Sequence, residues 1–389
     1  MMPGRLVEFN GMKKVLLGTP ANIAIAKLAE EQNAKRTVVI ASKTLHQNTT
    51  VVRDVIAALG NRFAAICNHI PPHSPRQAVF DATTTAREAK ADLIVTIGGG
   101  SVTDAGKAVT LFLANDIHDN LSLDRLRSHL STRGIPSDCY PPIVPQIAVP
   151  STLSAGEFSA ISGLTDERSK IKELFQHPAM IPASVVLDPG ITVHTPLWLF
   201  LSTGIRALDH AVEGYCSLEA HPYSDAQALH ALRLLSQGLP RVHKNPLDFK
   251  ARLDCQIGAW LSMAPVSTGV PMGASHGIGY VLGAAFGIPH GHTSCVMLPA
   301  VQQWNQTFIS ERQAHVSAAL SAPGEHAAVV LDRLISGLGL PRSLQSIGVG
   351  RDQFDLIATQ AMSTSWVPRN PRPITSSKHI LEILEIAAT

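Results

Sequence analysis

The first half of the chain alternates short runs of β-branched residues with segments of helical periodicity, and this alternation restricts the fold more than any other feature. Segments 20–33 and 48–59 have helical spacing. The runs expected to be strands are residues 14–18, 37–42, 63–68, 92–97 and 146–150. Because a strand followed by a crossover helix returns to a parallel neighbour, the pattern predicts a doubly wound α/β domain with a mostly parallel sheet. Its ligand is expected at the carboxyl ends of the strands.

The second half of the chain has a different texture, because strand signals stop near Pro196 and amphipathic helices follow. The expected helices are residues 204–216, 224–237, 249–263, 327–337 and 352–362. A turn-rich tripeptide, Asp188-Pro189-Gly190, ends a strand-like run at 184–187 and marks the junction. The sequence therefore predicts an α/β domain in residues 1–189 and an all-α domain in residues 190–389. The polar, proline-rich segment 117–145 is expected to run over the surface.

Composition excludes several classes of function. The formal net charge is only +2 and no Lys/Arg run occurs, so we expect a small-molecule partner and no nucleic acid. Residues 1–14 lack the apolar core of a signal peptide and no 18-residue apolar run occurs, so a cytoplasmic protein without a membrane partner is expected. The five cysteines are widely spread and never form C-x-x-C, so they are interpreted as reduced and structural, including Cys295 beside a histidine cluster.

A glycine-rich turn gives the sharpest local signal. Strand 92–97 runs directly into Gly98, Gly99 and Gly100, followed by Ser101 and a helix that carries Asp104 and Lys107. Glycine permits close backbone approach, and the exposed amides at a helix start, with the serine hydroxyl, can hold a pyrophosphate. An ordinary strand-to-helix turn is the alternative. The combined offsets favour dinucleotide binding by all six of these residues.

The choice of cofactor depends on the end of the second strand. Many dinucleotide sites place an acidic residue there to bind the ribose 2′-hydroxyl. Here the strand ends in Ala41-Ser42-Lys43-Thr44. Ser42 and Lys43 could accept a 2′-phosphate, which favours NADPH slightly over NADH. A solvated lysine without a ligand is the alternative.

These segments together resemble the iron-type (group III) alcohol dehydrogenases, a superfamily that includes maleylacetate reductases and, more distantly, dehydroquinate synthases. Residues 98–107 are similar to the family's nucleotide loop. Residues 150–159 resemble its P-T-T-x-x-G-[ST]-E-x-[ST] segment, which implies that Ser151, Thr152 and Ser154 contact the cofactor. Residues 161–166, 170–172 and 185–189 keep the family's order, and 370–375 resemble the N-P-R-P ending of maleylacetate reductases. The resemblance implies a dehydroquinate synthase-like fold, an NAD(P)H cofactor and a homodimer, which an edge strand at 7–17 could form.

The resemblance also implies a metal site, and here the chain departs from the family pattern. Relatives bind iron or zinc through a D-x-x-x-H pair on one helix and two further histidines. His210, His276 and His290 match ligand positions, but Arg206 occupies the Asp position. Residues four apart share a helical face, so the guanidinium would repel a cation. Asp209 lies about 100° around the helix from His210, so it is expected to face away from the metal site. We therefore expect no metal; if one binds, the three histidines are its ligands, with water as the fourth.

Without a metal, Arg206 is expected to stabilise the developing oxyanion or to clamp a substrate carboxylate. Tyr280 stands where most relatives have a histidine thought to assist proton transfer. It lies four residues after His276, so we expect it to donate the proton to the substrate. The nearby guanidinium is expected to stabilise the phenolate that forms, and the histidines are expected to relay a proton from solvent. A packed aromatic is the alternative for Tyr280, and His292 is interpreted as a turn residue.

The predicted function is NAD(P)H-dependent reduction of a carbonyl or activated alkene in a small, anionic substrate. Two alternatives remain open at this point. One is a non-redox elimination or cyclisation, since the related dehydroquinate synthases use bound NAD only transiently. The other is a catalytically inactive nucleotide-binding protein, because two site residues of the family are replaced. Net oxidation of the cofactor would distinguish the predicted reductase from both alternatives.

Overall fold

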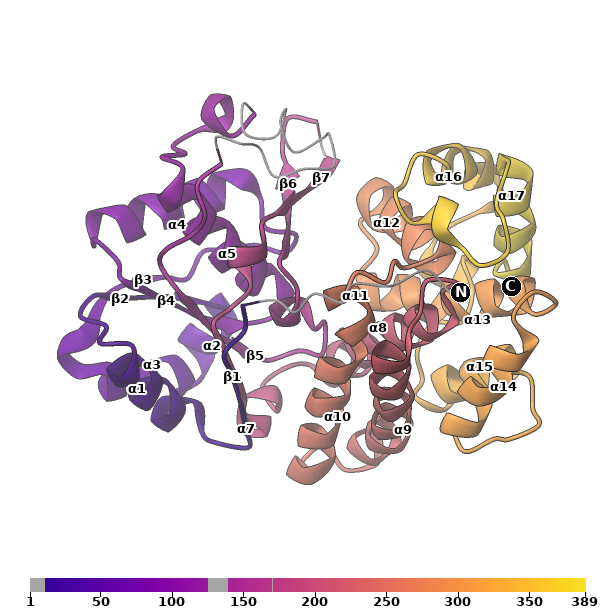
Figure 1. Cartoon of the computed structure of the whole chain (residues 1–389), viewed down its shortest axis with the longest axis horizontal. Helices are drawn as coiled ribbons and strands as arrows, with labels where there is room; N and C mark the ends of the chain where they lie inside the picture. Colours follow the sequence, from indigo (N-terminus) through magenta and orange to yellow (C-terminus); the bar gives the residue numbers. More distant parts are fainter. Residues whose placement is uncertain (1–10, 125–138, 170) are drawn as a thin grey trace, which may run out of the picture. The chain divides into compact units, whose positions relative to one another are not determined.

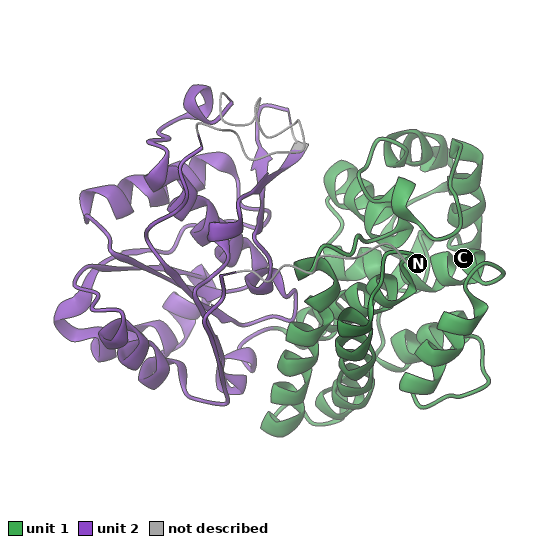
Figure 2. Ribbon diagram, in the orientation of Figure 1, with its two compact units in different colours: residues 1–9, 196–389 green, residues 10–195 purple. Residues whose placement is uncertain are grey.

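The structure, a computed structural model, describes residues 11–124, 139–169 and 171–389. It separates into two compact units that divide between Thr195 and Pro196 (Figure 2). The junction expected after residue 189 precedes this division by one short helix, α7 (Pro189–Thr192), which begins where Asp188 accepts a hydrogen bond from the amide of Gly190. Residues 7–10 of the expected edge strand, residues 125–138 of the expected surface excursion, and Lys170 lie outside the described residues.

The first unit is built on a parallel six-stranded sheet in the order β1-β8-β5-β4-β2-β3 (Figure 1). Every strand pair in it is parallel. The predicted α/β class is therefore confirmed, and every expected strand is present with ends shifted by a residue or so. The strands are β1 (Lys14–Leu17), β2 (Thr37–Ala41), β3 (Phe63–Cys67), β4 (Leu93–Gly98), β5 (Gln146–Pro150) and β8 (Ser184–Leu187).

Alternation along the strands places two apolar cores on opposite faces of this sheet. Val39 and Ala41 pack in one cluster with α1 (Ala21–Glu31) and α3 (Val51–Leu59). Val38 and Ile40 pack in another with α4 (Arg76–Glu88) and α5 (Gly100–Ala114). Figure 1 shows these two helix layers on either side of the strands. The short helix α2 (Lys43–Asn48) contributes Leu45 to the cluster that contains Val39 and Ala41.

An antiparallel hairpin, which the sequence analysis did not identify, lies beside the α4–α5 layer. Its strands are β6 (Ile161–Asp166) and β7 (Ile171–Gln176). Leu164 and Phe175 contribute apolar side chains to the cluster that includes Val38 and Ile40. The hairpin has one apolar face and many polar residues, so local periodicity alone was a weak signal.

The second unit is helical throughout its described residues, as predicted, and α8 (Leu197–Cys216) is its central element. All residues from Phe200 to Cys216 are buried, and α8 packs against α9, α10 and α13. The other helices are α9 (Pro222–Lys244), α10 (Phe249–Ser262), α11 (Ala264–Ser267), α12 (Ala274–Phe286), α13 (His290–Asn305), α14 (Ser310–Ala319), α15 (Ala327–Gly337), α16 (Phe354–Ala361) and α17 (Ser377–Ile386).

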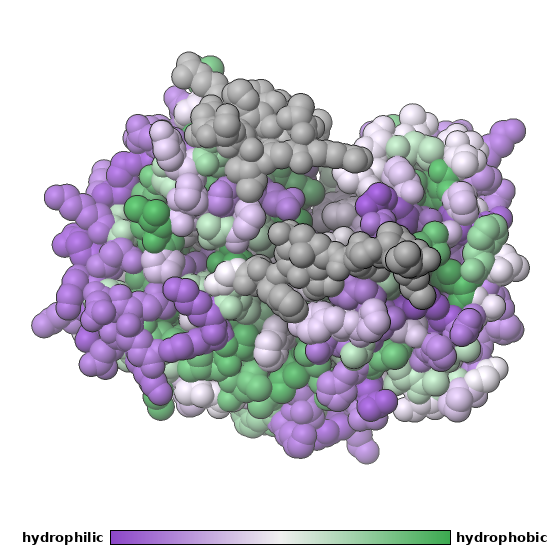
Figure 3. Space-filling model, in the orientation of Figure 1, coloured by the Kyte–Doolittle hydropathy of each residue, from purple (hydrophilic) through white to green (hydrophobic). Residues whose placement is uncertain are grey.

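No helix in the described part of the chain has the length and apolar character needed to cross a membrane. On the face shown in Figure 3, hydrophilic side chains gather over the region of α1 and α3. The buried side of α1, which includes Ile25 and Leu28, faces the sheet core instead.

Candidate functional site

The three predicted glycines lie where β4 passes into α5, and each is closely approached by another segment. A Cβ on Gly98 would lie 2.9 Å from Val102 Cγ2 and 3.1 Å from Ser42 Cβ. On Gly99 it would lie 3.3 Å from Thr152 Cγ2, and on Gly100 2.8 Å from Ser154 Oγ. The loops that follow β2, β4 and β5 therefore converge, and they leave no room for side chains on the glycine turn.

This convergence sits at a switch point of the sheet. From β2 the chain continues outward to β3, whereas from β4 it continues in the opposite direction to β5. Ser42 donates its amide hydrogen to Ile97 O over 2.8 Å, and Ser151 donates to Gly98 O over 2.8 Å. Lys43 is exposed beside them. Ligands of open α/β sheets bind at such a crevice, so the predicted cofactor residues are gathered where the topology favours them.

On the first turns of α5, Asp104 is half-buried and Lys107 is buried. Lys107 is fully buried, forms an ion pair with Asp104 over 2.8 Å, and donates hydrogen bonds to the backbone oxygens of Gly156 (2.8 Å) and Ile161. The amide of His73 donates to Ser101 Oγ over 2.9 Å. Asp104 and Lys107 thus hold the 156–161 segment in place, a supporting role that the sequence pattern did not distinguish from direct cofactor contact.

Glu157 is a buried acidic residue that the sequence analysis did not single out. It is 2% exposed and follows Ala155, which adopts a left-handed conformation (φ 60°). Its Oε2 atom has no hydrogen-bond partner within the described residues. Burial raises the pKa of this carboxyl to about 7, against the opposing charge of Lys107.

In the helical unit, Arg206 occupies the centre of a site formed by α8, α12 and α13. The residue is 7% exposed. Its NH1 group donates to Ser294 Oγ over 3.0 Å, and its guanidinium carbon lies 5.9 Å from the ring centre of Tyr280. Gly279 lies next to this group, and a Cβ there would lie 3.0 Å from Thr293 Oγ1 and in ordinary contact, 3.7 Å, with Arg206 NH1. The guanidinium is therefore a buried positive charge that donates a hydrogen bond to Ser294 of α13.

Asp209 lies in the same site, so the expectation that it faces elsewhere is wrong. Its Oδ2 atom accepts hydrogen bonds from Ser275 Oγ (2.8 Å) and Ser294 Oγ (2.6 Å), and it lies 3.9 Å from Arg206 NH1. The reason is tertiary: α8 is enclosed on all sides, so a side chain 100° around the helix still meets α12 and α13. Burial raises the pKa of Asp209.

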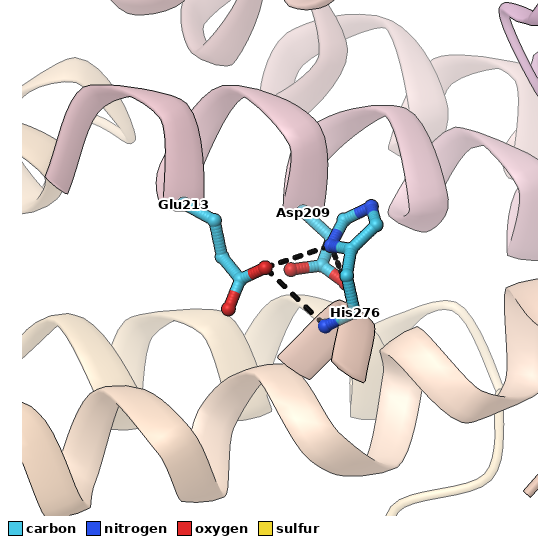
Figure 4. Close-up of side chains that lie close together, drawn as sticks. All are labelled: Asp209, Glu213 and His276. Carbon is cyan, nitrogen blue, oxygen red and sulfur yellow. Dashed lines mark hydrogen bonds and ion pairs between the residues drawn. The ribbon is translucent and has the colours of Figure 1, made fainter. Parts of the chain in front are cut away.

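Glu213, one turn further along α8, holds the start of α12 (Figure 4). Its carboxylate accepts the backbone amides of Gly273 (3.0 Å), Ser275 (2.8 Å) and His276 (3.3 Å). It also lies 2.8 Å from His276 Nδ1. Burial raises the pKa of Glu213 and lowers that of His276 to about 3, so the imidazole is neutral. With Nδ1–H donating to Glu213, Nε2 is left as an acceptor, and it has no partner among the described residues.

The remaining predicted catalytic residues surround this centre. The His210 ring lies 4.7 Å from the His276 ring, and burial, helped by the nearby His276 and Arg206, holds the pKa of His210 well below its usual value. Tyr280 meets the His290 ring edge-on at 5.8 Å. The structure therefore brings together all five residues predicted to be catalytic.

Two neighbouring residues take structural places. His292 is half-buried in the first turn of α13 and packs on Trp198 with ring centres 5.3 Å apart. Cys295 is fully buried, and burial raises the pKa of its thiol, which opposes thiolate chemistry.

One group of potential metal ligands is present among the described residues, and it differs from the predicted one. Ligand atoms of Asp209, Glu213 and His276 lie within 4.8 Å of one another. Sequence reasoning rejected Asp209 as facing elsewhere and gave Glu213 no role; the local signal for the pair was their spacing of four, which puts both on one face of α8. The set of His210, His276 and His290 does not form a comparable group in the described structure.

Comparisons with known proteins cover nearly the whole chain. Residues 13–189 match the family "Iron-containing alcohol dehydrogenase". Residues 200–388 match the family "Fe-containing alcohol dehydrogenase family, C-terminal". Dehydrogenase FUM7 of Gibberella moniliformis is 33% identical, with 97% of each chain covered. Maleylacetate reductase of Rhizobium sp. is 28% identical over 92% of this chain and 91% of its own. The crystal structure of maleylacetate reductase from that Rhizobium strain has a TM-score of 0.82 and 26% identity, covering 100% of this chain and 99% of its own.

Proposed function

The chain belongs to the iron-containing alcohol dehydrogenase family, and from this premise we propose that it is an NAD(P)H-dependent reductase that acts without a metal ion on the carbonyl group of a small anionic substrate. The observation that carries the proposal is the buried guanidinium of Arg206, which donates to Ser294. The resemblance places this residue at the family's Asp ligand position. The relatives named maleylacetate reductase support an anionic substrate.

The glycine turn supports a dinucleotide cofactor. Gly98, Gly99 and Gly100 let the loops after β2 and β5 approach the turn closely, at the start of α5, where no side chain caps the first backbone amides. A bound nicotinamide dinucleotide supplies the hydride. No acidic residue follows β2, where Ser42 and exposed Lys43 lie instead, and this favours NADPH slightly.

The residues of the helical site do not suit a resident iron or zinc ion. A buried guanidinium would repel the cation. Several carboxylate oxygens of this group already accept hydrogen bonds: Asp209 Oδ2 from two serines, and Glu213 from three backbone amides. A metal bound through these oxygens would compete with those donors beside the Arg206 guanidinium, so we assign no step of the reaction to a metal.

Arg206 and Tyr280 supply the chemistry that the substrate requires. As hydride reaches the carbonyl carbon, negative charge develops on oxygen, and N–H groups of Arg206 stabilise it in a site of low dielectric. The Tyr280 hydroxyl donates the proton that completes the alcohol. His276 is neutral and keeps an acceptor nitrogen, Nε2, without a partner in the described residues, so it can accept a hydrogen bond in the site. Its pKa of about 3 does not favour the proton relay that the sequence analysis expected of it.

The test combines metal analysis of the purified protein with NADH and NADPH oxidation assays against keto acids and neutral aldehydes. We expect metal well below one equivalent, activity that resists chelators, and turnover of a keto acid. Stoichiometric metal together with activity lost on chelation would overturn metal independence. Absence of cofactor oxidation with every carbonyl compound would overturn the proposed reaction.

A further inference from the structure

We propose that Arg206, Ser294 and Asp209 form an arginine clamp, in which Ser294 and Asp209 are positioning residues that orient the guanidinium so that its free edge takes a substrate carboxylate. This inference rests on the proposed function and narrows its substrate class to carbonyl compounds that carry a carboxylate. The three side chains are buried and come from two helices, α8 and α13.

The contacts run in one direction through the clamp. Arg206 NH1 donates to Ser294 Oγ over 3.0 Å, and Ser294 Oγ donates to Asp209 Oδ2 over 2.6 Å. The serine hydroxyl thus acts as acceptor for the cation and donor to the anion, which is the polarity that its single O–H allows. Each partner in turn fixes the hydroxyl rotor.

Asp209 is itself held from a third helix. Ser275, at the start of α12, donates to the same Oδ2 atom over 2.8 Å. Ser275 is fully buried, and its backbone amide donates to Glu213. The carboxylate orientation is therefore fixed by α12 and α13 together, and it passes that constraint to the arginine through Ser294.

The separation between arginine and aspartate decides what the clamp can bind. Arg206 NH1 lies 3.9 Å from Asp209 Oδ2, beyond the range of a direct hydrogen bond. A bidentate Arg–Asp pair would occupy two N–H groups, whereas the serine-bridged arrangement uses one of the five. Two parallel N–H groups therefore stay available for the fork-to-fork contact that a carboxylate makes.

A neutral carbonyl compound would match this site poorly. It can accept one hydrogen bond at the carbonyl oxygen, and it offers no second anionic oxygen to the other N–H groups of the largely buried Arg206. Sites built around buried polar groups reject ligands that lack the matching group by large factors. The clamp therefore predicts a preference for a keto acid over its methyl ester, which differs mainly in charge.

The experiment measures kcat/KM for the keto acid with the highest turnover and for its methyl ester, and takes the acid-to-ester ratio as the readout. It compares the unaltered enzyme with Ser294→Ala, Arg206→Met and the double variant. We expect Ser294→Ala to lower the ratio about tenfold in the Arg206 background and to leave it unchanged in the Arg206→Met background, because Ser294 acts through the arginine. Ser294→Thr, which keeps the hydroxyl, should restore most of the ratio.

A matched control separates positioning from folding. Ser262 is a fully buried serine of α10 that donates to Ala259 O over 2.7 Å, away from the clamp. Ser262→Ala should lower the free energy of unfolding by an amount similar to that of Ser294→Ala, and it should leave the acid-to-ester ratio unchanged. An unchanged ratio in Ser294→Ala, or equal losses in both arginine backgrounds, would overturn the clamp. If the unaltered enzyme turns over no keto acid, the proposed function fails before any variant is compared.

Discussion

Replacing Arg206 with methionine removes the one charge on which the proposed mechanism depends, and its effect can be worked from the structure. Arg206 is 7% exposed, so an effective dielectric of about 20 applies, and a substrate carboxylate about 4 Å from the guanidinium gains about 4 kcal/mol. Methionine abolishes this attraction. The expected loss is therefore about 4 kcal/mol, or roughly a thousandfold in kcat/KM for a keto acid.

The assay follows the absorbance of reduced nicotinamide with the keto acid and with its methyl ester. Arg206→Lys keeps the charge but loses the planar fork, so we expect it to recover all but about tenfold of the rate with the acid. Arg252→Met is the matched control, because Arg252 is also a buried arginine of the helical unit, packed 4.6 Å from the ring centre of Phe200. It should affect acid and ester equally. Keto acid turnover in Arg206→Met within threefold of the unaltered enzyme would refute the reasoning.

Three further predictions concern the α/β unit. Gly98→Ala places a Cβ 2.9 Å from Val102 Cγ2 and 3.1 Å from Ser42 Cβ, so the turn must shift; fluorescence titration should show NADPH binding weakened by about tenfold or more, and unchanged affinity would contradict cofactor binding at this turn. Lys107→Met removes the ammonium group that pairs with Asp104 and donates to the backbone oxygens of Gly156 and Ile161. Chemical denaturation should show the free energy of unfolding lowered by about 3–5 kcal/mol. A decrease below about 1 kcal/mol would show that Lys107 does not hold the 156–161 segment. Burial raises the pKa of Glu157 from 4.5 to about 7, so the folded protein keeps a proton that the unfolded chain releases. The free energy of unfolding should therefore fall between pH 4.5 and 7 by up to about 3 kcal/mol, and Glu157→Gln should lack that part of the decline; equal pH slopes in both proteins would count against it.

The amino-acid sequence alone determined the class of fold and the location of the nucleotide turn. Strand runs such as 37–42 and 92–97 have a period of two or continuous apolar character, and the glycine triplet at 98–100 has few uses other than a tight strand-to-helix turn. These signals are local, so they survive without knowledge of packing. The β6–β7 hairpin was missed because its register depends on Leu164 and Phe175 reaching a core formed by distant helices.

The sequence also showed that Arg206 and His210 share a helical face, since that follows from a spacing of four. It could not show what surrounds that face. Only the tertiary structure placed Asp209 against Ser275 and Ser294, and Glu213 against the first amides of α12. The physical reason is that α8 is buried on every side: helical spacing fixes the angle at which each side chain leaves the helix, but the packing of α12 and α13 decides which charges and hydroxyls it meets.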